Sequence, residues 1–107
     1  MERLHEHRKH VRQLVHFPCI FSIDGTHIID GVVVDLSMGG CRIKCGHAMH
    51  TGLSIELQVR PEHHAPVYVP YADIRWVEQD KLGVAFSQVS ESDAATLVRL
   101  LTLLPTS

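Results

Sequence analysis

Long apolar runs are missing from this sequence of 107 residues. A membrane-spanning helix needs roughly 18 or more consecutive apolar residues, and no segment approaches that length. The charged N-terminal segment also lacks the apolar stretch of a secretory signal peptide. We therefore expect a cytoplasmic protein that does not insert into a membrane and that folds as one domain around one modest core.

A basic excess and aromatic side chains are also scarce. The net charge is −2 and aromatic residues make up 6% of the chain, whereas a nucleic-acid groove needs many cations and stacking rings. A DNA or RNA partner is therefore not expected. The charge is uneven, however: residues 1–12 hold four of the ten basic and two of the twelve acidic residues, a balance of +2, which leaves −4 on the rest. A small cationic arm on an acidic body suits one small anion.

The cysteines form no disulfide or redox motif. There are three, with no C-x-x-C pair, and Cys41 and Cys45 fall on the same side of a strand-like segment as Ile43. We interpret them as small buried apolar residues. No nucleophile, base and orienting group occur together, so the sequence does not predict an enzyme.

Alternating apolar residues predict six strands. The period of two is clearest in residues 15–23 and 53–60, and Asp24-Gly25 after the first of these is a hairpin-type turn. Pro70 lies inside the fifth segment and predicts a sheet edge or a bulge there. The six predicted strands are residues 15–23, 28–36, 41–45, 53–60, 67–77 and 81–87.

A helix is predicted after the last strand. Ser90 opens it, Asp93 stands at the position of a capping-box partner, and Pro105 ends it. Apolar residues at helical spacing predict its buried face, which consists of Ala94, Leu97, Val98, Leu101 and Leu104. This order of elements predicts a mainly β fold, a small six-stranded antiparallel β-barrel with a C-terminal α-helix.

Two short motifs have spacings that suit a binding site. Arg8 and Arg12 lie four residues apart ahead of the first strand, which puts both side chains on one side of the chain whether it is helical or extended. Asp35, Ser37 and Gly40 form a D-x-S-x-x-G pattern at the end of the second predicted strand. Taken alone, the first motif is explained by a solvated basic arm and the second by an ordinary turn.

Together, the two motifs resemble the PilZ domain family of bacterial receptors for cyclic di-GMP. R-x-x-x-R comes before D-x-S-x-x-G within a six-stranded pattern that ends in a helix, and the resemblance extends from Arg8 through that helix. It implies a flexible basic N-terminal arm in residues 1–12 and a PilZ β-barrel with its helix in residues 13–107. The implied ligand is cyclic di-GMP, and no other cofactor is expected.

The resemblance gives the motif residues roles that fit their chemistry. Arg8 and Arg12 would bind the phosphates and the O6 and N7 acceptors of guanine, which an arginine fork matches. Asp35 would accept from the N–H donors on the other edge of guanine, and Ser37 would donate to a phosphate oxygen. These assignments make the end of the second strand a site for a guanine and a phosphate together.

Further candidates lie beside these residues. Gly39 and Gly40 can adopt positive φ and would let the backbone approach the ligand without a Cβ in the way. His7 and Lys9 neighbour the first motif arginine, and a bystander role and a solvated lysine are their alternatives. Trp76 stands where some family members have an aromatic against which a guanine packs, and its alternative is a side chain of the barrel wall.

The histidines also raise the question of a metal. His5, His7 and His10 form H-x-H-x-x-H, with His63 and His64 as conceivable partners. Structural zinc normally needs four well-spaced ligands, often including cysteine. Because the cysteines are expected in the core, we predict no metal site.

The resulting prediction is a cyclic di-GMP receptor or adaptor that acts on an unidentified protein effector. Residues 1–12 contain few apolar side chains, so we expect the chain before about Arg12 to be mobile without ligand and ordered by it. The alternative is a PilZ-fold module for protein–protein interaction that binds no nucleotide. The motif residues favour the receptor, since family members that work as nucleotide-free modules lack them.

Overall fold

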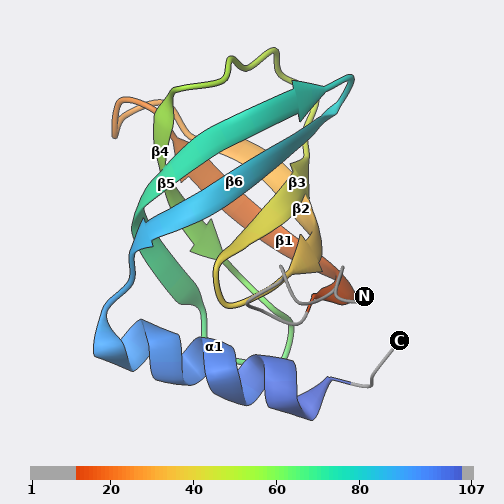
Figure 1. Ribbon diagram of the computed structural model, residues 1–107, viewed down its shortest axis with the longest axis vertical. Helices are drawn as coiled ribbons and strands as arrows, with labels where there is room; N and C mark the ends of the chain where they lie inside the picture. Colours follow the sequence, from red (N-terminus) through yellow and green to blue (C-terminus); the bar gives the residue numbers. More distant parts are fainter. Residues whose placement is uncertain (1–11, 105–107) are drawn as a thin grey trace, which may run out of the picture.

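The computed structural model describes residues 12–104, which form a closed β-barrel with one helix (Figure 1). Neighbouring strands are antiparallel, and their order around the barrel is β1-β2-β3-β6-β5-β4. The predicted fold class is therefore confirmed. The elements are β1 (Gln13–Ser22), β2 (Ile29–Leu36), β3 (Gly40–Lys44), β4 (Ser54–Val59), β5 (Val67–Glu78), β6 (Lys81–Gln88) and α1 (Glu91–Leu103).

The core fills the inside of the barrel with alternate residues from each strand. On β4, for example, Ile55, Leu57 and Val59 are buried while the residues between them face outward. The cysteines are free and buried, as the sequence predicts. Burial raises the pKa of the Cys19 thiol to about 12 and that of Cys41 well above its ordinary value, so both thiols behave as small apolar groups.

Pro70 lies in a bulge, one of the two outcomes that the sequence predicts. In the β4–β5 ladder, Leu57 pairs with Val69 and Ile55 with Ala72, so Glu56 alone faces the two residues between them. A closed barrel has no edge strand, and the bulge is the remaining place for a residue that cannot donate to the ladder.

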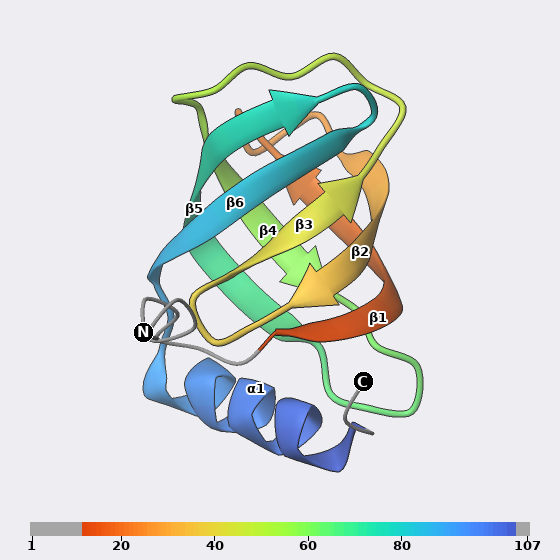
Figure 2. The ribbon, with the colours of Figure 1, turned by 45° about the vertical axis from the view of Figure 1, so that its right-hand side comes forward.

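The helix lies across one end of the barrel (Figures 1 and 2). Ser90 is its N-cap and accepts from the backbone N–H of Asp93, and Asp93 in turn accepts from the backbone N–H of Tyr68 on β5 at 3.0 Å. Its buried residues are Leu97 and Leu100. The prediction that Val98 is buried was wrong: Val98 is 49% exposed, because the helix covers the barrel with a narrow stripe. No helix within residues 12–104 is long and apolar enough to cross a membrane.

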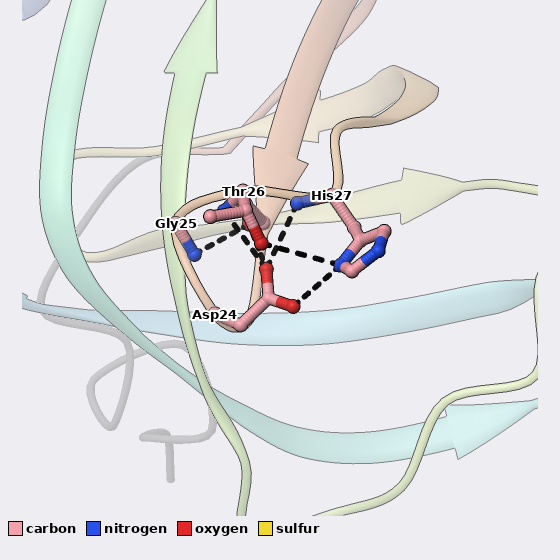
Figure 3. A network of polar contacts seen from close by, with 5 residues as sticks. Asp24, Gly25, Thr26 and His27 are labelled. Carbon is pink, nitrogen blue, oxygen red and sulfur yellow. Dashed lines mark hydrogen bonds and ion pairs between the residues drawn. The ribbon is translucent and has the colours of Figure 1, made fainter.

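The loop between β1 and β2 is held by one carboxylate (Figure 3). Asp24 Oδ1 accepts from the backbone N–H groups of Thr26 and His27, both at 2.9 Å. Asp24 Oδ2 lies 2.6 Å from Nδ1 of the His27 ring. Gly25 has a φ of 81°, a conformation that favours glycine, so the predicted Asp-Gly turn is confirmed.

Candidate ligand-binding site

Asp35 and Arg12 join the two sequence motifs. They are 23 residues apart, and Asp35 Oδ1 accepts from Arg12 Nη1 at 2.9 Å. Antiparallel pairing of β1 with β2 sets Leu14 opposite Asp35, which brings the start of β1 to the end of β2. Figure 2 shows both at the end of the barrel that the helix covers.

A bulge in β2 turns Asp35 to the outer face of the barrel. Val33 pairs with Ile43 and Asp35 with Arg42, so the register against β3 shifts by one residue at Val34. Val33 and Leu36 are both fully buried although they are three residues apart. Regular alternation from Val33 would have pointed the Asp35 carboxylate into the apolar core, so the bulge is what turns it away from the core.

Arg42 is a second cation on the same carboxylate, and the sequence analysis missed it. Its Nη2 donates to Asp35 Oδ2 at 3.2 Å from the directly opposite position on β3. Asp35 is only 5% exposed, and a carboxylate so buried needs charged partners because losing water costs several kcal/mol. Pairing the residues on either side of the turn between Ser37 and Gly40 would have placed Arg42 opposite Asp35.

Ser37 closes the turn between β2 and β3. Its backbone N–H donates to the Gly40 carbonyl at 2.9 Å and its hydroxyl donates to the same carbonyl at 3.2 Å. The hydroxyl oxygen also accepts from the Gly39 N–H at 3.2 Å. The Ser37 side chain therefore holds this turn, where it is only 5% exposed.

Gly39 and Gly40 do not use the positive φ that glycine allows. Among residues 12–104, the glycines with positive φ are Gly25 and Gly52. Gly40 is needed for a different reason: a Cβ there would come 2.2 Å from the Val84 carbonyl oxygen on β6. The glycine lets β3 approach β6 closely, so its role in this structure is in the barrel wall.

Trp76 belongs to the same outer face as Asp35. Pairing across the strands gives one row, in which Asp35 lies opposite Arg42, Arg42 opposite Gly83, and Gly83 opposite Trp76. Trp76 is 38% exposed, and its indole occupies the space beside Gly83 that a side chain would otherwise fill. The row therefore presents a carboxylate, a guanidinium and a flat aromatic ring on neighbouring strands.

The remaining predicted residues of the arm, His7, Arg8 and Lys9, lie outside the described residues, and so does the His5 to His10 motif. Within residues 12–104, no group of three or more His, Cys, Asp or Glu side chains is placed to hold a metal ion. The described groups can form charge-assisted hydrogen bonds: guanidinium groups can donate to anions and other acceptors, and a carboxylate can accept from N–H groups.

Comparisons with known proteins agree with the observed fold. A family model described as PilZ domain matches residues 6–103. Similar solved structures include the Bacillus subtilis inhibitor of motility MotI/DgrA, with 20% identity and a TM-score of 0.75 over 98% of this chain and 55% of that one. YcgR from Escherichia coli, in complex with c-di-GMP, has 17% identity and a TM-score of 0.76 over 89% of this chain and 44% of that one.

A third similar structure is the PilZ domain of CeSA from a cellulose synthesizing bacterium. It has 20% identity and a TM-score of 0.68 over 86% of this chain and 95% of that one. At these identities the likeness shows the shared fold. The chain spans about half the length of the MotI and YcgR chains, and a search of curated proteins finds no match.

Proposed function

The chain belongs to the PilZ domain family, and from this premise we propose that it is a receptor for cyclic di-GMP rather than an enzyme. The observation that supports the proposal most is the contact between Arg12 and Asp35, which joins the family's two motifs at one place. Their neighbours Ser37 and Gly40 complete the second motif. The proposed ligand has two phosphates and two guanines, which match these donors and acceptors.

In this proposal each motif residue contacts a particular group of the ligand. Arg8 and Arg12 donate to phosphate oxygens and to the O6 and N7 acceptors of guanine. Asp35 accepts from the guanine N–H groups, and the hydroxyl of Ser37 turns from the Gly40 carbonyl to a phosphate oxygen. A handful of such bonds at about 1.5–3 kcal/mol each, offset by the cost of association, gives an affinity on the order of micromolar or tighter.

Other residues of the site add contacts around these. His7 and Lys9 approach the phosphates with the arm, Gly39 lines the turn, and the exposed face of Trp76 packs against a guanine. Of this group, Trp76 and Gly39 lie among the described residues: Gly39 lies in the turn between β2 and β3, and Trp76 lies on β5 in the row that contains Asp35.

Ligand binding alters the arm, and the altered surface is read by a protein effector. By pairing with Arg8 and Arg12, the dinucleotide ties residues 1–12 to the barrel near Asp35. Because cyclic di-GMP is an intracellular messenger of bacteria, the receptor works in the cytoplasm.

Calorimetric titration with cyclic di-GMP, GTP and cyclic GMP tests the binding. The wild type should bind cyclic di-GMP, and Arg8→Ala or Arg12→Ala should weaken binding at least about tenfold, the loss expected for one charged contact. Arg60→Ala is the matched control, since Arg60 donates to Gln58 at 2.7 Å and has no role in the site. A wild type that binds no cyclic di-GMP would refute the proposal and leave the nucleotide-free interaction module.

Amide hydrogen exchange tests the proposed transmission. Protection of residues 4–14 should increase when cyclic di-GMP is added and stay unchanged with GTP. If protection of these residues is the same with and without ligand while calorimetry shows binding, the arm does not carry the response.

A further inference from the structure

Asp35 has two guanidinium partners, and they are attached to the barrel in different ways. Arg42 sits within β3, directly opposite Asp35 in the ladder, so the sheet fixes its backbone. Arg12 comes before the first residue of β1, and 46% of its side chain is exposed. Arg12 is therefore the partner that can exchange, and Arg42 is the partner that stays.

Ligand binding makes this difference important. In the proposed function, Arg12 gives its donors to the dinucleotide, and Asp35 Oδ1, which now accepts from Arg12, is offered to a guanine. Without a second cation, the nearly buried Asp35 carboxylate would lose its counter-charge in that exchange. An uncompensated carboxylate at 5% exposure is costly, so the exchange requires a counter-ion that remains in place.

Arg42 also has one hydrogen-bond donor without a partner. Its Nε is buried and has no hydrogen-bond partner, although a buried donor of this kind is normally satisfied. In a planar guanidinium, Nε–H and Nη2–H point along one edge, the edge that a carboxylate accepts side-on. Nη2 already donates to Asp35 Oδ2 at 3.2 Å, and Nε–H is the second donor of the edge to which Nη2 belongs.

We propose that Arg42 is a positioning residue of the ligand site: it is the fixed counter-ion of Asp35 and orients the carboxylate toward guanine when Arg12 exchanges to the ligand. The pair then gains the second, Nε-based contact as the Arg12 contact is lost. A carboxylate has room for this, because its two oxygens accept about four hydrogen bonds in all. The inference rests on the proposed function, and it assigns Arg42 a role through Asp35 and not through the phosphates.

The test compares cyclic di-GMP with cyclic di-AMP. The second dinucleotide lacks the guanine N–H groups from which Asp35 would accept hydrogen bonds. Calorimetric titrations would use the wild type, Arg42→Ala, Arg42→Lys, Asp35→Ala and the double variant, with Arg60→Ala as the matched loss of one cation. Arg42→Ala should weaken cyclic di-GMP binding at least about tenfold and reduce the preference for guanine. Arg42→Lys should recover part of both, because it restores the charge but not the side-on pair. In the Asp35→Ala background, Arg42→Ala should have little further effect.

Three outcomes separate the possibilities. If Arg42→Ala binds as tightly and selectively as Arg60→Ala, the inference is wrong while the proposed function stands. Arg42→Ala could instead weaken the binding of both dinucleotides equally, and do so in the Asp35→Ala background as well. That result would mean that Arg42 contacts a phosphate directly, which also overturns the inference. If the wild type binds no cyclic di-GMP, the proposed function falls and the inference with it. Should Arg42→Ala fail to fold, Arg42→Lys decides: wild-type affinity and preference overturn the inference, and weakened, less selective binding supports it.

Discussion

The indole of Trp76 on β5 occupies the side-chain space of Gly83, its cross-strand partner on β6. A Cβ built on Gly83 would come within 2.1 Å of Trp76 Nε1 and 2.2 Å of Cε2. Glycine at this position therefore lets the ring lie close to the barrel surface, next to the strand that carries Arg42. The two residues form one feature: Gly83 makes the space and Trp76 fills it with a flat ring that is still 38% exposed.

Substitution Gly83→Ala should move the ring and weaken ligand binding. The clash is with an aromatic side chain that can turn away, so the stability of the barrel should change little. If a guanine stacks on the ring, the loss of affinity should reach about fivefold or more, since stacking of a base on an aromatic contributes about 1–3 kcal/mol. Calorimetry measures the affinity, and the fluorescence of Trp76, the single tryptophan in the sequence, reports the ring.

The control for this substitution is Gly46→Ala, because a Cβ on Gly46 meets nothing within 4 Å. It should leave both fluorescence and binding unchanged. A Gly83→Ala variant with altered fluorescence but normal affinity would remove Trp76 from the site.

Substitution Gly40→Ala should destabilise the barrel itself. Its Cβ would meet the Val84 carbonyl oxygen at 2.2 Å, and a backbone atom in a ladder cannot turn away as a ring can. We expect a loss of about 1–3 kcal/mol in the free energy of unfolding, the usual cost of overpacking. Urea denaturation followed by circular dichroism measures it against Gly46→Ala, and a stability equal to that control would contradict the structural role of Gly40.

The sequence predicted the barrel well because its strands alternate cleanly and its turns use Asp, Ser and Gly. The resemblance assigned Arg12 and Asp35 to one ligand site, but the direct contact between their side chains was not predicted. Period-two reasoning could not place Asp35 correctly, however. The bulge at Val34 reverses which residues face outward, and no residue in that run of valines marks where the extra residue falls.

Two further misses have physical causes. Arg42 looked like an ordinary outward-facing strand residue until the register set it opposite Asp35. The predicted buried face of the helix wrongly included Val98. A helix that covers only the end of a barrel buries fewer residues per turn than a helix packed between layers. In both cases the missing information was tertiary placement.

The three cysteines should be unreactive toward thiol reagents in the folded protein. Cys19, Cys41 and Cys45 are all buried, and burial raises the pKa of Cys19 to about 12, so at pH 8 that thiol has almost no reactive thiolate. Titration with a chromogenic disulfide reagent at pH 8 should detect almost no thiol before urea is added and three after. A full reaction in the absence of urea, at a rate faster than unfolding, would contradict the described core.

The last prediction concerns pH and the loop between β1 and β2. The hydrogen bond and the negative charge of Asp24 raise the pKa of His27 above its ordinary value of 6.5. The backbone and side-chain hydrogen bonds from His27, with those from Thr26 and Ser22, lower the pKa of Asp24 below its ordinary value of 3.8. The pair is therefore most favourable when His27 is protonated and Asp24 is ionised (Figure 3).

The direction of the pH effect follows from these two shifts. Because the folded pKa of His27 is raised, its contribution to stability is full below about pH 6.5 and is lost as pH rises through the folded pKa. Because that of Asp24 is lowered, its contribution is full above about pH 4 and is lost as pH falls through the folded pKa. The stability difference between wild type and His27→Ala should therefore be largest between these values and shrink on both sides. Urea unfolding across this range measures it, with Asp24→Asn as the background in which His27→Ala should lose its pH dependence. Both side chains are solvent-exposed, so the effect should be small, and a difference that is constant from pH 4 to 9 would mean that the pair does not form in solution.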